Sequence, residues 1–184
     1  MSTYKIAFVV GSLRKDSINK QLATALSKLL PKDFSATFVD IGELPLYNQD
    51  ADEATPEVVQ KFKRAIADAQ GVVFVTPEYN RSIPGVLKNA LDQGSRPYGQ
   101  NVWQGKPVGI VGTSSGAIGT ALAQQHLRNV LAFLAMPTLT QPEMFLKFTD
   151  GLIDAQGHVT NEGTQKFLQG WVDAYVSWVK KFVA

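Results

Sequence analysis

The sequence contains no cysteine, and this absence excludes several classes of protein at once. Disulfide-stabilised scaffolds, thiolate metal sites and cysteine nucleophiles all need a residue that the chain does not have. Histidine is also scarce, since only His126 and His158 occur. Two histidines are too few for a metal centre built from imidazoles. We therefore expect no resident metal ion and a function that does not depend on a thiol.

Long hydrophobic runs and a surplus of one charge are missing too. No apolar stretch approaches the roughly 20 residues of a membrane-spanning helix, and the first residues lack the layout of a signal peptide. Lysine and arginine number 18 against 16 aspartates and glutamates, and the two signs are intermixed. Nothing in this balance indicates nucleic acid or a membrane surface as a partner. We expect a cytoplasmic protein that acts on small molecules.

The residues that are present alternate between strand and helix patterns over 184 positions, of which 45% are hydrophobic. This length favours one domain, residues 1–184. Apolar runs predict strands at 4–10, 34–41, 71–76, 106–113 and 136–139, with helical periodicity between them and a continuation of the fifth strand past Pro142 left open. Such alternation predicts an α/β fold with a five-stranded parallel sheet in the order 2-1-3-4-5 and helices on both faces.

A polar loop follows the first predicted strand and leads into a helix. It opens with Gly11 and contains Ser12, Arg14, Ser17 and Asn19. The start of a helix presents unpaired backbone N–H groups and the positive end of the peptide dipoles, which together favour a phosphate. Serine and asparagine side chains donate hydrogen bonds, and a guanidinium fits phosphate oxygens. The loop is predicted to hold a phosphate monoester.

Other interpretations of this loop compete with the phosphate site. No Gly-Lys-Ser/Thr follows Gly11 at the spacing of a Walker A motif, and the glycines of a dinucleotide-binding Gly-x-Gly-x-x-Gly motif are missing. Asp40 nevertheless lies where a ribose-binding acid would be in a dinucleotide fold. An ordinary strand-to-helix turn, capped by Asp16 or Ser17, explains the same residues without any ligand.

Two more loops are expected at the same edge of the sheet, because ligands of open α/β sheets bind beyond the carboxyl ends of the strands where the strand order reverses. Residues 77–85 follow the third strand and bring an aromatic face and an amide in Tyr79 and Asn80. Residues 114–116, Ser-Ser-Gly, follow the fourth strand and leave room for a flat ring. Each loop alone is explained as a surface turn. Together the three loops predict a mononucleotide site that FMN would fill.

Two motifs carry a family resemblance: GSLRKDSIN at residues 11–19 and PEYNRSIPGVLKNALD at residues 77–92. They resemble the NADPH-dependent FMN reductase family and, within it, the bacterial chromate and quinone reductases. The resemblance implies a flavodoxin-like three-layer fold, bound FMN, and electron transfer from NADH or NADPH to quinones, flavins, azo compounds or metal oxyanions such as chromate. It also implies a homodimer or homotetramer in which Leu46 and Tyr47 lie over the flavin of a neighbouring subunit.

The same resemblance, carried over residue by residue, assigns the phosphate to Ser12, Arg14, Ser17 and Asn19, one side of the flavin ring to Pro77, Glu78, Tyr79 and Asn80, and its other edge to Ser114, Ser115 and Gly116. The expected mechanism is a ping-pong exchange in which the acceptor replaces the oxidised nucleotide over the same ring face. Because the chemistry takes place on the flavin, no side chain is assigned as a catalytic acid, base or nucleophile.

Two other functions are alternatives to a reductase. A flavodoxin-type electron carrier would bind FMN without a nicotinamide site, but such carriers usually present a strongly acidic face, and the net charge here is +2. A dinucleotide-binding dehydrogenase is disfavoured by the missing glycines. His126 has no serine or cysteine nearby in the sequence, so a place on the surface or at an interface is expected for it.

Overall fold

Burial along the first strand shows why this chain forms a parallel sheet covered on both sides. In the computed structural model, which describes residues 4–183, Ala7 and Val9 of β1 (Tyr4–Val10) pack into one core cluster. Phe8 and Val10 pack into a second cluster on the opposite face. A strand that is apolar on both faces is stable only between two layers of helices.

The strands form one five-stranded sheet in the order β2-β1-β3-β4-β5, and all four neighbouring pairs are parallel. This confirms the predicted α/β class and strand order. The other strands are β2 (Phe34–Val39), β3 (Gly71–Val75), β4 (Val108–Ser114) and β5 (Phe145–Lys147).

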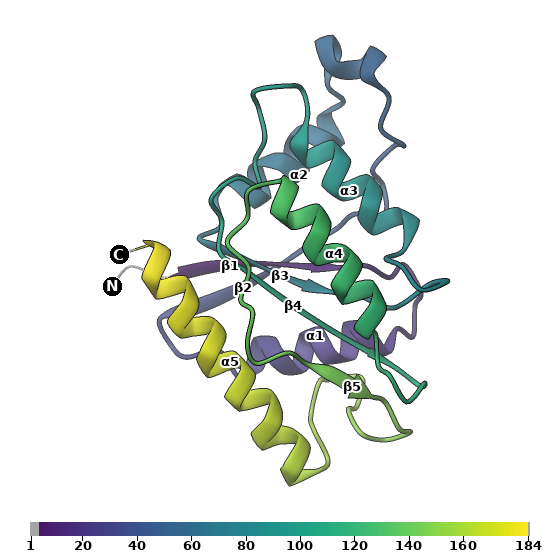
Figure 1. Ribbon diagram of the computed structural model, residues 1–184, viewed down its shortest axis with the longest axis vertical. Helices are drawn as coiled ribbons and strands as arrows, with labels where there is room; N and C mark the ends of the chain where they lie inside the picture. The colour runs from purple at the N-terminus through teal and green to yellow at the C-terminus, as the bar shows by residue number, and fades with distance from the viewer. Residues whose placement is uncertain (1–3, 184) are drawn as a thin grey trace.

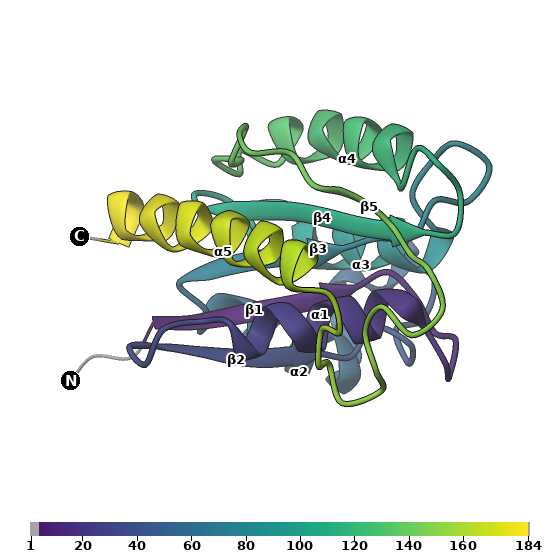
Figure 2. The same cartoon turned by 90° about the horizontal axis from the view of Figure 1, so that it is seen from below.

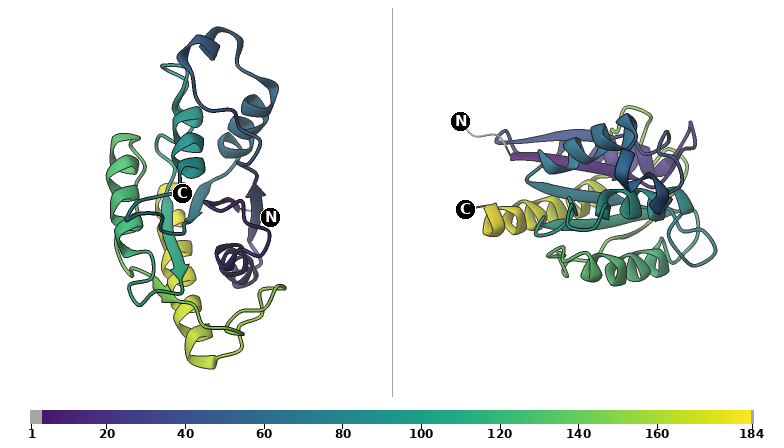
Figure 3. Two further views of the ribbon diagram at one scale, coloured as in Figure 1. Left: turned by 90° about the vertical axis from the view of Figure 1, so that its right-hand side faces the viewer. Right: turned by 90° about the horizontal axis from the view of Figure 1, so that it is seen from above.

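The helices cover the two faces of the sheet unequally. The apolar side chains of α2 (Glu57–Ala67), α3 (Gly85–Ser95) and α4 (Ala121–Phe133) lie in one core cluster, and those of α1 (Ile18–Lys28) and α5 (Glu162–Val183) lie in the other. The three layers can be followed in Figures 2 and 3. A short 3-10 helix, η1 (Gln49–Ala54), was not predicted from the sequence.

The fifth strand corrects the sequence prediction. Residues 136–139 form only an isolated bridge, between Thr138 and Val108, and the regular strand β5 begins at Phe145. Proline has no N–H to donate to a sheet; Pro137 lies inside the predicted segment and Pro142 follows it. The chain therefore touches β4 once, leaves it, and pairs again several residues later.

The carboxyl edge of the sheet gathers the loops that the sequence singled out. In Figure 1 the segments that follow β1, β3 and β4 lie on the same side of the molecule, opposite the start of β1 and the end of α5. Residues 42–56, with η1 at their tip, project from the body of the fold (Figures 1 and 3). Within residues 4–183 no helix is long and apolar enough to span a bilayer. The cytoplasmic location stays a prediction.

Candidate functional site

The start of α1 offers hydrogen-bond donors to the carboxyl edge. Ser17 is the N-cap, and its Oγ accepts a hydrogen bond from the backbone N–H of Lys20 at 3.3 Å. This leaves the hydroxyl proton of Ser17 for a further acceptor, and the first N–H groups of the helix have no intrahelical acceptor. Ser12, five residues before Ser17 in the sequence, is buried, while Arg14 is exposed. The capped turn and the phosphate site are therefore compatible with each other.

Asn19 is placed differently from the other residues of this loop. Its buried amide donates from Nδ2 to the carbonyl oxygen of Thr113 at 2.9 Å, and its Oδ1 accepts from the Thr113 N–H at 3.0 Å. The side chain thus joins the start of α1 to the end of β4. With one Nδ2 hydrogen and Oδ1 engaged at Thr113, the second Nδ2 hydrogen and the backbone N–H are the donors of Asn19 that remain for a phosphate.

Gly11 allows the loop after β1 to lie against the loop after β3. Its N–H donates to the carbonyl oxygen of Val75 at 2.9 Å. A Cβ added at Gly11 would lie 3.2 Å from Leu87 Cδ2 and 3.4 Å from Pro77 Cδ. The absence of a side chain therefore brings two of the three predicted loops into contact.

The loop after β3 is attached to α4 by a carboxylate. Glu78 Oε2 accepts hydrogen bonds from the backbone N–H groups of Leu122 and Ala123 at 3.0 and 3.1 Å. Glu78 Oε1 also pairs with Arg81 Nη1 at 3.4 Å. A carboxylate at a helix N-terminus satisfies unpaired donors and interacts favourably with the helix dipole. Glu78 thus supports the ring side of the site by fixing its loop.

A tight turn follows Glu78 and presents the predicted ring-binding residues. Tyr79 and Ser82 exchange both backbone hydrogen bonds, at 2.9 and 3.0 Å. Between them, Asn80 and Arg81 have φ angles of 52° and 67°, in the left-handed region. Non-glycine residues adopt this conformation at a cost, and such strain gathers at ligand-binding sites. The Tyr79 side chain is 54% exposed, so its ring is accessible to a ligand.

The loop after β4 leaves open space. Ser114 is half-buried, and its Oγ donates to the carbonyl oxygen of Gly119 at 2.5 Å, which folds the loop back on itself. Ser115 and Gly116 are exposed. A Cβ added at Gly116 would meet only Ser114 Oγ, at 3.5 Å. A flat ring can therefore approach this backbone closely.

These groups fit FMN. The start of α1 supplies hydroxyl and backbone donors with the exposed guanidinium of Arg14, which is the chemistry that a phosphate monoester requires. The two other loops supply an accessible aromatic ring and small residues, as an isoalloxazine requires. Asp40, the predicted ribose-binding acid of the dinucleotide alternative, instead accepts the N–H of Gly42 through Oδ1 at 2.8 Å and closes a turn.

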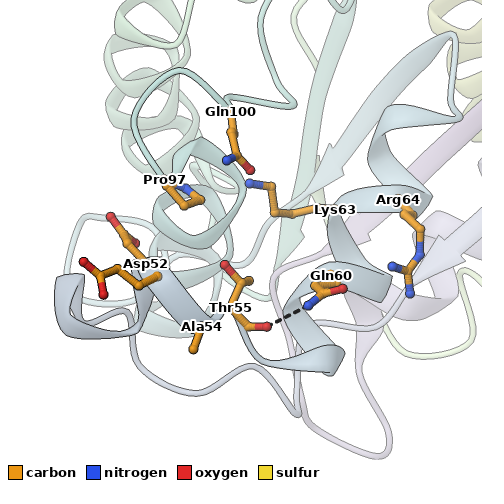
Figure 4. A pocket seen from close by; sticks show the side chains of 9 residues that line it. Asp52, Ala54, Thr55, Gln60, Lys63, Arg64, Pro97 and Gln100 are labelled. Atoms are coloured by element: carbon orange, nitrogen blue, oxygen red, sulfur yellow. Dashed lines mark hydrogen bonds between the residues drawn. The ribbon is translucent and has the colours of Figure 1, made fainter.

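A cavity of about 620 Å³ lies away from the three loops, between η1, α2 and residues 97–100 (Figure 4). In Figure 4 the Lys63 amine points toward Gln100. Lys63 donates to the carbonyl oxygen of Arg96, and desolvation lowers the pKa of its ammonium group. The lining mixes the carboxylates of Asp52 and Glu53 with basic groups and includes no residue predicted to bind FMN. We assign no ligand to it.

One contact at the site was missed by the sequence analysis. Ser82 Oγ and His126 Nδ1 lie 2.6 Å apart, although the two residues are separated by 44 positions. The expectation for His126 used only residues nearby in the sequence. No local signal announces this partner, because it depends on how α4 packs beside the loop after β3.

Known proteins resemble this chain in sequence and in fold. The profile of the family described as NADPH-dependent FMN reductase matches residues 4–150. A 2-hydroxy-1,4-benzoquinone reductase from a Burkholderia species is 61% identical over 176 residues, with 96% of each chain covered. A quinone reductase from Pseudomonas putida is 50% identical over 178 residues, covering 96% of this chain and 95% of the relative.

A solved structure extends the likeness to three dimensions. The flavoenzyme NAD(P)H:(acceptor) oxidoreductase from Paracoccus denitrificans superposes with a TM-score of 0.94 at 46% identity, covering 98% of this chain and 99% of that one. The flavodoxin-like fold, the enzyme class, FMN and NAD(P)H, all predicted from the sequence, are confirmed. The chain belongs to the NADPH-dependent FMN reductase family.

Proposed function

We propose that this enzyme reduces quinones with NADH or NADPH through an FMN held at the carboxyl edge of the sheet. The observation that carries the proposal is the joining of three loops at one site. Gly11 packs against Pro77, Asn19 bonds to Thr113, and Glu78 bonds to the start of α4. The names of the two similar reductases support a quinone as the acceptor.

The assigned residues have distinct roles in this proposal. Ser12, Ser17, Arg14 and the N–H groups at the start of α1 bind the phosphate. The turn after Glu78 and the loop at 114–116 orient the ring and present backbone groups to it. When bound, FMN accepts a hydride from the nicotinamide nucleotide and passes the electrons to the acceptor. The protein contributes binding, orientation and partial exclusion of water, and no side chain is needed as an acid or a base.

The open side of the site supports a wide acceptor range. Tyr79, Ser115 and Gly116 are exposed, so flat quinones, free flavins and azo compounds can reach the same ring face. Arg81 is exposed as well and adds a positive charge that favours oxyanions such as chromate. We expect a panel of these acceptors to be reduced at different rates under saturating FMN.

We also propose that residues 1–184 act as one FMN-binding domain that assembles into a homodimer or homotetramer. Leu46, Tyr98 and Phe133 are 84%, 93% and 90% exposed, which is unusual for such large apolar side chains. Tyr98 and Phe133 line a cavity of about 690 Å³ together with Tyr47. A second copy would cover this surface, and Phe133→Asp is expected to lower the mass measured by light scattering.

Purification followed by two measurements tests the function. The protein should carry bound flavin, or take up FMN when it is added, and should oxidise NADH or NADPH steadily in the presence of 1,4-benzoquinone. Initial rates at varied nucleotide and quinone should give parallel lines if the acceptor replaces the nucleotide. A protein that binds FMN but oxidises neither nucleotide would be an electron carrier. A protein that binds no flavin would overturn the proposal.

A further inference from the structure

His126 contacts the flavin-side loop from a different element. It lies on α4, two turns or less from the helix start, and its Nδ1 is 2.6 Å from Ser82 Oγ. Ser82 is the last residue of the turn that begins at Tyr79. The imidazole is exposed and Ser82 is half-buried, so the bond lies at the rim of the site.

The turn held by this contact does not have the sequence that its backbone prefers. Two-residue turns with positive φ at both central positions favour Asn-Gly, because glycine adopts this conformation without strain. Here the second central residue is Arg81, with φ of 67°. A non-glycine residue in the left-handed region persists when the surrounding structure holds it there. The holding contacts are therefore part of what shapes the site.

Two contacts attach the turn to α4, one on each side of it. Before the turn, Glu78 accepts from the N–H groups of Leu122 and Ala123. After the turn, Ser82 bonds to His126. The first contact alone fixes one end of the Tyr79–Ser82 segment. The second contact fixes the other end and so limits how far Tyr79 and Asn80 can move.

We propose that His126 is a positioning residue, which through Ser82 holds the Tyr79–Ser82 turn in the conformation that receives the flavin ring. This inference rests on the proposed function, because Tyr79 and Asn80 are the ring-side residues of that site. In this role His126 contacts Ser82 and does not contact the phosphate. Loss of the contact should therefore weaken binding of the ring and leave binding of the phosphate unchanged.

Binding of two flavins, riboflavin and FMN, distinguishes the ring-binding part of the site from the phosphate-binding part. Riboflavin has the ring without the phosphate, whereas FMN has both. We expect His126→Ala and Ser82→Ala to raise the Kd of the apo-protein for riboflavin and for FMN by the same factor, about 3- to 10-fold, as loss of one net hydrogen bond implies. The midpoint potential of bound FMN should shift in both variants. Ser17→Ala should weaken FMN binding and leave riboflavin binding unchanged.

The controls separate positioning from general damage. His158→Ala changes the other histidine, which bonds to Asp154 in an exposed loop before α5, and should leave both Kd values and the potential as in the wild type. His126→Asn places a polar amide near the position of Nδ1 and should recover most of the affinity. The double variant His126→Ala/Ser82→Ala should bind like either single variant, because one contact is lost in all three.

The outcomes are distinguishable from failure of the proposed function. If the wild-type protein binds neither flavin, the proposed function and this inference both fail. If the wild type binds FMN and the His126→Ala and Ser82→Ala variants bind both flavins equally well with an unchanged potential, only this inference is wrong. It is also wrong if the effects of the two substitutions add in the double variant, or if His158→Ala reproduces them.

Discussion

At the scale of single residues, two buried polar atoms of the described part of the chain have no hydrogen-bond partner. Among the residues that the structure describes, the buried side-chain atoms that lack a hydrogen bond are Tyr175 Oη and Gln124 Oε1. Tyr175 stacks on Trp171 with 5.4 Å between ring centroids, and a Cβ at Gly71 would lie 2.6 Å from its hydroxyl. Gly71 thus gives room to a hydroxyl that finds no acceptor. Burial raises the pKa of Tyr175 well above its ordinary value.

We expect Tyr175→Phe to stabilise the protein by about 1 kcal/mol, since it removes an unsatisfied buried hydroxyl and keeps the ring. The pKa of Tyr175 is higher in the folded state than in the unfolded state, so the unfolded state ionises first. The stability that the wild type owes to keeping this phenol neutral is fully present below the unfolded pKa of about 10. It is lost as the pH rises above that value. The variant should therefore lose less stability above pH 10 than the wild type. Urea unfolding at neutral and alkaline pH measures both effects.

A helical glycine supplies the second prediction at this scale. Replacing glycine by alanine within a helix usually stabilises it by about 0.5–1 kcal/mol. In α3, however, a Cβ at Gly94 would lie 2.4 Å from Nε1 of the fully buried Trp103. We expect Gly94→Ala to destabilise the fold by about 1–3 kcal/mol through overpacking. Gly170→Ala in α5, where nothing lies within 4 Å, should be stabilising. Equal effects in thermal unfolding would contradict the packing argument.

At the scale of elements, the helices that begin near the site, α1 and α4, have different N-caps. The start of α1 is capped by its own Ser17, whereas Thr120, the N-cap of α4, makes no side-chain capping bond. Glu78 from the loop after β3 supplies that cap instead. At the opposite end of the fold, Lys106 donates to the carbonyl oxygens of Ala67, the last residue of α2, and of Ala69 just after it. A side chain that caps a helix of another element also holds the two elements together.

The borrowed cap of α4 is testable in the apo-protein. Glu78→Gln keeps the shape of the side chain and removes the charge that faces the helix dipole. We expect a loss of about 1 kcal/mol in the free energy of unfolding, smaller at high salt. Glu57→Gln, which removes a first-turn charge from α2, should cost less because Glu57 forms no such pair of capping bonds. If urea titrations gave equal losses for the two variants, the two hydrogen bonds of Glu78 would add nothing to stability beyond the effect of a first-turn charge.

At the scale of the whole molecule, the sequence predicted the sheet order, the two helical layers and the three loops. These features follow from hydrophobic periodicity and from the handedness of parallel connections. It placed the fifth strand at 136–139 with a continuation past Pro142 left open, and the regular pairing lies only in that continuation, at 145–147, because Pro137 interrupts the first segment. It also could not predict that Asn19 and Glu78 bond to distant backbone groups. Such partners depend on tertiary packing, which leaves no local pattern.

The link between α1 and β4 gives the prediction for the whole molecule. Asn19→Ala would leave the buried N–H and carbonyl oxygen of Thr113 without their partners. We expect a loss of about 2–3 kcal/mol in the free energy of unfolding, as for unsatisfied buried polar groups, together with weaker FMN binding. Asn161→Ala, which removes the exposed acceptor of the Thr164 N–H at the start of α5, is the control: it should lower the free energy of unfolding by about 1 kcal/mol and leave FMN binding unchanged. A variant as stable as the wild type would mean that water replaces the amide without penalty.

The Asn19 amide also sets a length. It fixes the distance between the turn proposed to bind the phosphate and the end of β4, next to the loop proposed to receive the ring. We therefore expect the site to favour one length of the sugar-alcohol chain that joins the phosphate to the ring. A synthetic flavin phosphate with one carbon fewer or one more in that chain should seat only one of its ends and bind little better than the half that fits.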